Sequence, residues 1–281
     1  MRTETTITQT TTEDKTEALL EQLHAGIEDL TSTEAWTAWL DVARHLPSYS
    51  LNNLILLWTQ NPNVTHVAGY RAWKKLGRQV RRGEKCLRVL APCTYKTTDE
   101  DTGEDRQVIR GFRAVAVFDI SQTDGDPLPK APVTTLTGEV PRLFRHQLAC
   151  LIRAEGFTFR LGPMPAGHEE ANGITDWGTR TVTVRDDLTD AQAAKTTAHE
   201  LAHVLLHGPD CRLARGTREI EAESVAYLVS ASAGLDASGY SFGYVAGWAG
   251  GDLEAITDTA SRVLDTARGI TARLTPTDGS D

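Results

Sequence analysis

The chain has 281 residues, of which 40% are hydrophobic and 24% are charged. This composition is typical of a globular protein and excludes collagen, a coiled coil and wholesale disorder. No apolar run approaches the roughly 20 residues needed to cross a bilayer, and the first residues contain no apolar segment of the kind found in secretory signals. The four cysteines are scattered without a CxxC pair, so we expect reduced thiols in a cytoplasmic protein without membrane contacts.

Charge is unevenly distributed along the chain. The net charge is −9, yet residues 64–96 contain nine basic residues and one acid, Glu84. That segment therefore carries +8 and the remainder carries −17. Because local charge decides which polyanions a surface attracts, this segment is a candidate for contacting nucleic acid despite the acidic average.

Apolar residues at helical spacing predict three helices in the first 60 residues, after a polar, Thr-rich start that we expect to be disordered. The first helix begins near Thr16. Residues 31–34 fit a capping box for the second helix, which Pro47 ends. The third helix covers 50–60 and carries a strongly apolar stripe.

The next segment combines a basic turn with a predicted hairpin. A short helical turn is expected at 70–76, followed by the basic turn at 81–85. Two β-rich runs, 87–95 and 108–120, flank an acidic loop and predict the hairpin. Residues 121–140 contain three prolines and few large apolar side chains, so we expect an inter-domain linker there.

The second half mixes helices with short strands. The expected helices cover 141–155, 218–233 and 253–274, together with a long helix that Thr189-x-x-Gln192 caps and that runs through His207. The expected strands lie near 157–159, 174–177 and 181–184. The whole pattern predicts an α+β protein with two domains. Its expected parts are a tail and leading helix at 1–30, a small α+β domain at 31–120, the linker at 121–140, a second domain at 141–275 and a tail at 276–281.

His199, Glu200 and His203 form an HExxH sequence within the long helix of the second half. Residues four apart share one helix face, so both imidazoles can reach one ion, with Glu200 beside them as a general base. The neighbouring residues are apolar, and burying two histidines and a carboxylate without a partner is costly. The alternative is an ordinary helix whose histidines are surface residues or satisfied core residues.

Zinc requires a third protein ligand, and the best candidates lie in the following helix. Glu219 and Glu223 are four residues apart and share a face, whereas Glu221 points elsewhere. If Glu219 binds the ion, Glu223 can accept the free N–H of a ligand histidine, and the reverse assignment stays open. His207 continues the histidine face, and we expect it at the rim of the site.

The segment AHELAHVLLH at 198–207, followed by ExxAE at 219–223, resembles the ImmA/IrrE-type zinc metallopeptidase domain. The resemblance covers about residues 141–250 and implies a minimal gluzincin, with a bent sheet over the active-site helix. It implies Zn²⁺ held by His199, His203 and Glu219, with Glu200 as the catalytic base. Peptide hydrolysis also needs an oxyanion stabiliser, for which Tyr240 and Tyr244 are candidates.

The basic segment interleaves aromatic and cationic residues. Cations neutralise phosphates and flat rings stack on unpaired bases, a combination suited to single strands without sequence preference. The candidate nucleic-acid contacts are Tyr70, Arg71, Trp73, Lys74, Lys75, Arg78, Arg81, Arg82 and Lys85. The alternative is a solvated basic face on which Tyr70 and Trp73 are core anchors.

Three motifs in order, SYSLNN at 48–53, VAGYRAW at 67–73 and LGRQVRRGEK at 76–85, are similar to the N-terminal domain of ArdC-type antirestriction proteins. The similarity covers about residues 31–120. It implies a single-stranded-DNA-binding domain joined to a zincin-like domain, in proteins associated with mobile elements and with shielding incoming DNA from restriction. The segment after Glu223 departs from that family and is closer to ImmA-like peptidases.

These observations predict a single-stranded-DNA-binding protein of the antirestriction type that carries a Zn²⁺-dependent, metallopeptidase-like domain. One alternative is a regulatory zinc metallopeptidase that cleaves a DNA-associated protein such as a repressor. Another is a non-enzymatic DNA-binding scaffold in which zinc only holds the fold together. A Glu200→Gln substitution separates them, because it removes the base and leaves the ligands in place.

Overall fold

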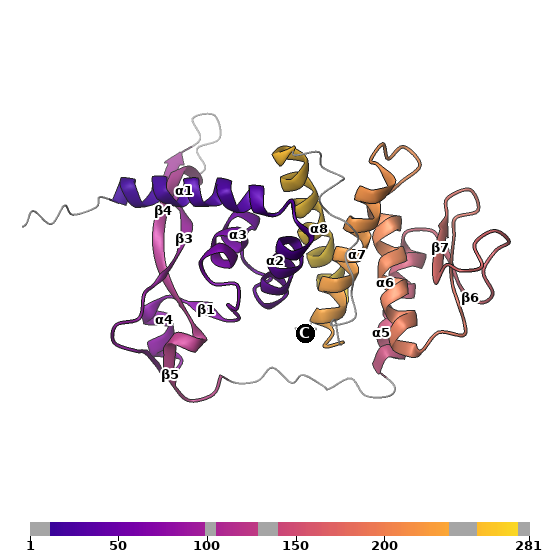
Figure 1. The fold of residues 1–281 in the computed structure, drawn as a ribbon, viewed down its shortest axis with the longest axis horizontal. Coiled ribbons are helices and arrows are strands. Elements are labelled where there is room, and N and C mark those ends of the chain that lie inside the picture. The colour runs from indigo at the N-terminus through magenta and orange to yellow at the C-terminus, as the bar shows by residue number, and fades with distance from the viewer. Residues whose placement is uncertain (1–11, 99–104, 129–139, 236–251, 275–281) are drawn as a thin grey trace, which may run out of the picture. The chain divides into compact units, whose positions relative to one another are not determined.

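The chain forms two compact units, whose helices and strands are labelled in Figure 1. The computed structural model describes residues 12–98, 105–128, 140–235 and 252–274. Of these, the residues up to Asp29 and Ser48–Leu128 form the first unit, whereas Leu30–Pro47 and the residues from 140 onward form the second. Both units mix helices with strands, so the expectation of a two-domain α+β protein is confirmed. No helix among the described residues is long and apolar enough to cross a bilayer.

The first unit packs helices against a long β-hairpin. Its elements are α1 (Thr12–Asp29), α3 (Leu51–Gln60), β1 (Val67–Ala68), α4 (Tyr70–Lys75), β2 (Arg78–Val80), β3 (Leu87–Thr98), β4 (Asp105–Asp119), the 3-10 helix η1 (Ile120–Gln122) and β5 (Thr123–Gly125). β4 lies between β1 and β3 and pairs antiparallel with both. α1 and α3 both contact the hairpin, and residues 54–57 of α3 are fully buried in the core.

Two side-chain amides of α3 cover the free edge of β3. Asn53 hydrogen-bonds both backbone groups of Leu90, at 2.9 and 2.8 Å. Gln60 does the same for Arg88, at 2.9 and 2.8 Å. The amides thus take the place of a neighbouring strand, and they close this part of the edge to pairing with another chain.

The residues after the hairpin belong to the first unit rather than to a linker. Asp119 and Gln122 form a capping box around η1, and the following β5 pairs antiparallel with β2. The expected linker at 121–140 therefore begins too early. Proline content signalled the linker, but the pairing partner of β5 lies more than 40 residues earlier in the chain, where a local pattern does not reveal it.

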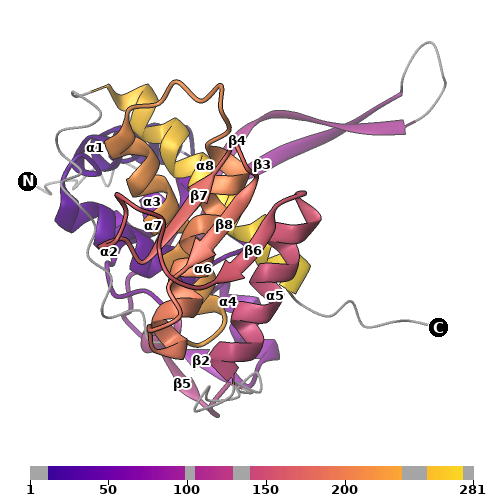
Figure 2. The same ribbon diagram turned by 90° about the vertical axis from the view of Figure 1, so that its right-hand side faces the viewer.

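The second unit is a helical layer with a small mixed sheet. Its elements are α2 (Thr33–His45), α5 (Val140–Ala154), β6 (Thr158–Leu161), β7 (Gly173–Asp176), β8 (Thr181–Val184), α6 (Asp190–Leu206), α7 (Arg215–Ser232) and α8 (Leu253–Leu274). β8 lies between β6, with which it runs parallel, and β7, with which it runs antiparallel (Figure 2). α6 packs against α5, α7 and two strands of this sheet, and α8 packs against α7.

Helix α2 belongs to this second unit, although the domain expected at 31–120 includes it. The fully buried indole of Trp36 donates a hydrogen bond to Ser224 Oγ of α7, at 2.9 Å. The Tyr227 hydroxyl, also on α7, donates to Asp41 at 3.1 Å. Trp36 and Trp39 stack at an angle with ring centroids 5.1 Å apart. Packing of these aromatic rings on α7, rather than proximity in sequence, places the helix.

Candidate functional site

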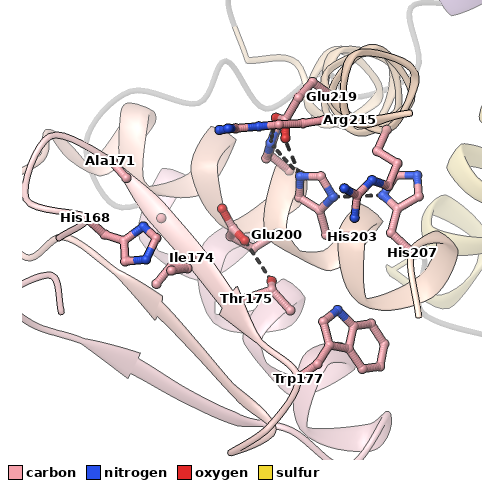
Figure 3. A pocket seen from close by; sticks show the side chains of 13 residues that line it. His168, Ala171, Ile174, Thr175, Trp177, Glu200, His203, His207, Arg215 and Glu219 are labelled. Atoms are coloured by element: carbon pink, nitrogen blue, oxygen red, sulfur yellow. Dashed lines mark hydrogen bonds and ion pairs between the residues drawn. The ribbon is translucent and has the colours of Figure 1, made fainter. Parts of the chain in front are cut away.

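Helices α6 and α7 bring together His199, His203 and Glu219, three side chains that could hold one metal ion; Figure 3 labels the last two. His199 and His203 lie one turn apart on α6, and their Nε2 atoms are 3.0 Å from each other. Glu219, in the second turn of α7, places Oε2 3.4 Å from His199 Nε2 and 3.7 Å from His203 Nε2. The spacing of HExxH explains the first pair, because residues four apart share a helix face.

These three atoms match the donor set and the spacing of a zinc site. Ligands roughly 2.0–2.2 Å from one tetrahedral centre lie about 3.3–3.6 Å from one another. The observed separations of 3.0, 3.4 and 3.7 Å bracket that range. Two imidazole nitrogens and one carboxylate oxygen also suit a borderline metal better than magnesium or calcium, which favour oxygen ligands. The residues present therefore fit a divalent ion such as zinc.

Glu223 lies one turn beyond Glu219 and contacts the outer nitrogen of a histidine. Its Oε2 atom is 3.0 Å from His199 Nδ1. Burial alone would lower the pKa of His199, but the hydrogen bonds to Glu219 and Glu223 outweigh it and raise the pKa to about 10. The contacts with His199 and His203 in turn hold the pKa of Glu219 well below its ordinary value. The pair Glu219 and Glu223 thus contacts both sides of the His199 ring.

Glu200 is buried beside the three residues, with 4% of its surface exposed. The Thr175 hydroxyl of β7 donates a hydrogen bond to its Oε2 atom at 2.7 Å. Burial raises the pKa of the Glu200 carboxyl above its ordinary value. Gly173, also on β7, lies so close that a Cβ atom there would be 2.7 Å from Glu200 Oε1. Neither Thr175 nor Gly173 follows from a sequence motif, because strand β7 meets α6 only in the folded unit.

A pocket of about 360 Å³ opens onto this group of side chains. Its lining includes His199, Glu200, His203 and Glu219, together with aromatic and basic residues that the sequence motifs did not identify. Figure 3 shows His168 and Trp177 on the sheet side of this pocket and Arg215 beside Glu219. His199, His203, Glu219 and the Glu200 carboxyl therefore line one common space.

His207 lies in the interior, and the expectation that it sits at the rim is wrong. Only 2% of its surface is exposed. Its Nδ1 atom is 2.8 Å from His203 Nδ1, and its Nε2 atom is 2.8 Å from Oε2 of the fully buried Glu221. Arg262 of α8 donates from Nε to the other oxygen of Glu221 at 2.8 Å. Sequence spacing indicated that His207 continues the face of His203, but its other partner, Glu221, comes from α7, and Arg262 of α8 bonds Glu221 in turn.

The oxyanion candidates Tyr240 and Tyr244 lie outside the described residues.

The exposed basic surface of the first unit is smaller than the sequence predicts. Tyr70 is 49% exposed, and its hydroxyl accepts a hydrogen bond from Gln79 at 2.7 Å. Six cations are exposed on α4 and on the turn after β2; apart from Arg81, which is ion-paired, they are Arg71, Lys74, Lys75, Arg82 and Lys85. Within α4, positions 71, 74 and 75 share a helix face. We call Tyr70 and these five cations the α4 basic surface.

Three predicted nucleic-acid contacts instead hold the first unit together. Trp73 is 1% exposed and donates its indole N–H to the Phe118 carbonyl at 2.9 Å, so its ring is a core anchor and cannot stack on a base. Arg78 donates to Thr123 at 2.7 Å and to the backbone of residues 123, 125 and 126. Arg81 pairs with Glu84 at 2.8 Å and with Asp124 at 3.3 Å. Side chains whose donors are already engaged offer little to a phosphate.

Two family models match consecutive parts of the chain. Residues 9–118 match the N-terminal domain of the anti-restriction factor ArdC. Residues 154–233 match the IrrE N-terminal-like domain. The resemblances seen in the sequence motifs are therefore confirmed for both halves.

Individual proteins extend the comparison. The crystal structure of the antirestriction ArdC protein from the R388 plasmid, in metal-free form, is 24% identical with a TM-score of 0.51 and covers 80% of this chain and 85% of that chain. Its Mn(II)-bound structure is 22% identical with a TM-score of 0.49, covering 82% and 86%. An uncharacterized protein of Bacillus anthracis is 25% identical over 263 residues, 78% of this chain but 44% of that protein.

The likeness to the metal-free structure shows a shared fold, and the chain spans less than half the length of the Bacillus anthracis relative. The order of the two matched domains agrees with the two units of the structure, apart from α2. The chain therefore joins a domain that matches the N-terminal domain of the anti-restriction factor ArdC to a second domain that matches the IrrE N-terminal-like domain.

Proposed function

We propose that this is a single-stranded-DNA-binding protein of the antirestriction type whose second unit is a zinc-dependent peptide hydrolase. The observation that carries the hydrolase is the convergence of three ligand atoms and one buried carboxyl on a single pocket. His199, His203 and Glu219 supply the ligand atoms, and Glu200 supplies the carboxyl. Three protein ligands beside an open pocket are typical of catalytic zinc, whereas structural zinc has four protein ligands.

The residues of the pocket suit proton transfer during amide hydrolysis. A zinc ion held there supplies Lewis acidity, which polarises the scissile carbonyl and activates water. Thr175 holds Glu200 Oε2 at 2.7 Å, so Oε1 is left to take a proton from the attacking water and to return it to the leaving amine. Burial raises the pKa of the Glu200 carboxyl toward neutral pH. A general base exchanges protons most effectively when its pKa lies near the working pH.

A Glu200→Gln variant tests the hydrolase. It keeps the size of the side chain and one oxygen for Thr175, and it leaves the three ligands unchanged. We expect zinc content to match the wild type, while hydrolysis of a quenched fluorescent peptide library falls by at least a hundredfold. His168→Ala, which truncates a side chain in the wall of the same pocket, is the control. If Glu200→Gln hydrolyses the library at the wild-type rate, Glu200 is not the base and the proposal fails.

The α4 basic surface is the proposed site for single-stranded DNA. Its five exposed cations can neutralise phosphates, and the half-exposed Tyr70 ring can stack on a base, a contact worth about 1–3 kcal/mol. The match of residues 9–118 to the ArdC N-terminal domain supports nucleic acid as the ligand. Stacking on one ring with charge neutralisation around it favours unpaired strands over duplex.

A salt titration tests this surface. Fluorescence anisotropy with a labelled oligothymidine should give an affinity that falls linearly with salt on logarithmic axes, with a slope of about −0.7 per neutralised phosphate. The double substitution Arg82→Gln and Lys85→Gln should reduce that slope by about 1.4. Arg212→Gln, which removes an exposed cation of the second unit, should leave it unchanged. An unaltered slope in the double variant would move the contact elsewhere.

Glu200→Gln also separates the two activities. If this variant still protects DNA from a restriction enzyme, hydrolysis is not the protective step, and the DNA-binding unit carries the antirestriction function. If protection is lost with hydrolysis, the regulatory peptidase that cleaves a DNA-associated protein becomes the better account. The buried carboxyl in an open pocket favours an enzyme over a scaffold with purely structural zinc.

A further inference from the structure

A line of polar side chains, of which His207 and Glu221 are buried, extends from His203 to helix α8. His203 Nδ1 is 2.8 Å from His207 Nδ1, and His207 Nε2 is 2.8 Å from Glu221 Oε2. Arg262 closes the line with two contacts to Glu221 Oε1, at 2.8 Å from Nε and 2.6 Å from Nη2. The Arg262 guanidinium also donates to Thr259 at 3.0 Å. Three helices, α6, α7 and α8, therefore contribute to one chain of hydrogen bonds.

The donors and acceptors of these groups give the line of hydrogen bonds one direction. A neutral imidazole has one N–H donor and one acceptor nitrogen, and an ionised carboxylate only accepts. Arg262 holds Glu221 as an acceptor, so Glu221 takes the hydrogen of His207 Nε2 and leaves His207 Nδ1 as an acceptor. His203 must then carry its hydrogen on Nδ1. The lone pair of His203 consequently lies on Nε2, the nitrogen that is 3.0 Å from His199 Nε2 and that faces Glu219 in Figure 3.

Reversing the direction of these hydrogen bonds would leave buried groups without a partner. His207 is 2% exposed and Glu221 is fully buried, so water is not at hand to replace a lost partner. The other histidine, His199, is held differently, because its Nδ1 atom contacts the Glu223 carboxylate directly at 3.0 Å. The two ligand rings thus have separate supports, of which only the one for His203 reaches α8.

We propose that His207, Glu221 and Arg262 are positioning residues that keep the Nε2 lone pair of His203 turned toward the metal site, so that α8 helps to set metal affinity. This inference rests on the metal site of the proposed function. Partners of this kind typically change metal affinity by about 10–100-fold when they are replaced. Because this line of hydrogen bonds orients His203, it differs from a salt bridge that only joins two helices.

Glu221→Gln is the sharpest test, because it preserves shape and removes one acceptor. The amide NH₂ of the new side chain must face either His207 or Arg262. Facing His207, it donates to Nε2 and reverses both imidazoles, which puts a hydrogen on His203 Nε2 where the ion binds. Facing Arg262, it sets donor against donor. Because Arg262 can only donate, the amide oxygen should face Arg262 and the NH₂ should face His207, so we expect affinity for Co²⁺ or Zn²⁺, measured by chelator competition, to fall about 10–100-fold.

Two variants of Arg262 supply a graded comparison. Arg262→Lys keeps a charged donor near Glu221 and should retain more metal affinity than Arg262→Gln. Arg273→Gln is the matched control, because it removes an α8 arginine that pairs with Glu155 at 2.9 Å, away from the line. The visible absorption spectrum of bound Co²⁺ reports the ligand set directly. It should change in Glu221→Gln and remain that of the wild type in Arg273→Gln.

The outcomes separate this inference from the metal site on which it rests. If His203→Ala keeps full zinc occupancy, the metal site itself is wrong. If His203→Ala loses zinc but Glu221→Gln binds Co²⁺ with wild-type affinity and spectrum, the metal site stands and the positioning role is refuted. A Glu221→Gln protein that is less stable without metal, yet unaltered in affinity and spectrum, also refutes it, because the line would then only support the fold.

Discussion

Replacing Gly173 with alanine should press strand β7 against helix α6. A Cβ atom at this position would lie 2.6 Å from Thr196 Cγ2, 2.7 Å from Glu200 Oε1 and 2.9 Å from Glu200 Cγ. Ordinary contacts begin near 3.4 Å, so neighbouring atoms must move by roughly 0.5–0.8 Å. Thr196 is buried, and Thr175 holds Glu200 in place. Neither side chain can therefore turn aside freely.

The cost follows from overpacking a close-packed interior. Added volume in such a place typically destabilises by about 1–3 kcal/mol, which corresponds to about 2–4 °C in Tm per kcal/mol for a unit of 150–250 residues. A shift of the base by a fraction of an ångström should also lower hydrolysis, up to about a hundredfold, while zinc remains bound. The two consequences arise from one contact and should appear together.

Denaturant unfolding, zinc analysis and the peptide-library assay measure these effects. Gly162→Ala is the matched control, because Gly162 follows β6 in the same sheet and a Cβ there meets nothing within 4 Å. It should change stability by about 0.5 kcal/mol or less. If Gly173→Ala is as stable and as active as Gly162→Ala, the inferred pressure on Glu200 is incorrect.

Three further variants test other parts of the structure. Trp36→Phe keeps a ring but removes the donor to the buried Ser224, and unfolding should show a loss of about 1–3 kcal/mol; no loss would argue against the packing of α2 on α7. Thr175→Val removes the hydrogen-bond donor to Glu200, so the pKa of Glu200 should rise further. The acid limb of the pH–rate profile should then move to higher pH, and an unmoved limb would contradict this contact. Burial alone would raise the pKa of Asp119, but hydrogen bonds from residues 65, 66 and 121 lower it. The stability that Asp119 contributes is therefore present above its unfolded pKa, near 3.8, and is lost as pH falls through the lower folded value. Asp119→Asn should show a weaker loss of stability in acid, and identical acid unfolding of the two proteins would exclude this role.

Local spacing was enough to predict much of the candidate metal site. The pairs His199 with His203 and Glu219 with Glu223 share helix faces because residues four apart always do in an α-helix. The structure brings the first three of these residues together, and their roles as ligands stay predictions. The same rule could not reveal Arg262, which lies 41 residues from its partner Glu221 and reaches it only through the packing of α8 on α7.

In the basic segment, composition does not predict which side chains are exposed. An aromatic residue among cations has the same pattern whether its ring faces solvent or the core. Tyr70 is exposed and Trp73 is buried, although they lie three residues apart on one short helix. The difference depends on where strand β4 passes, since Phe118 provides the carbonyl that Trp73 bonds. Tertiary packing decides which members of such a segment can contact a ligand.

The position of a bound ion tests the central claim most directly. An anomalous difference map, measured on both sides of the zinc absorption edge from crystals grown with zinc, locates the metal without reference to activity. We expect one peak per chain, about 2.0–2.2 Å from His199 Nε2, His203 Nε2 and a carboxylate oxygen of Glu219. A peak bound by Glu223 in place of Glu219, or no peak between the two histidines, would contradict the account.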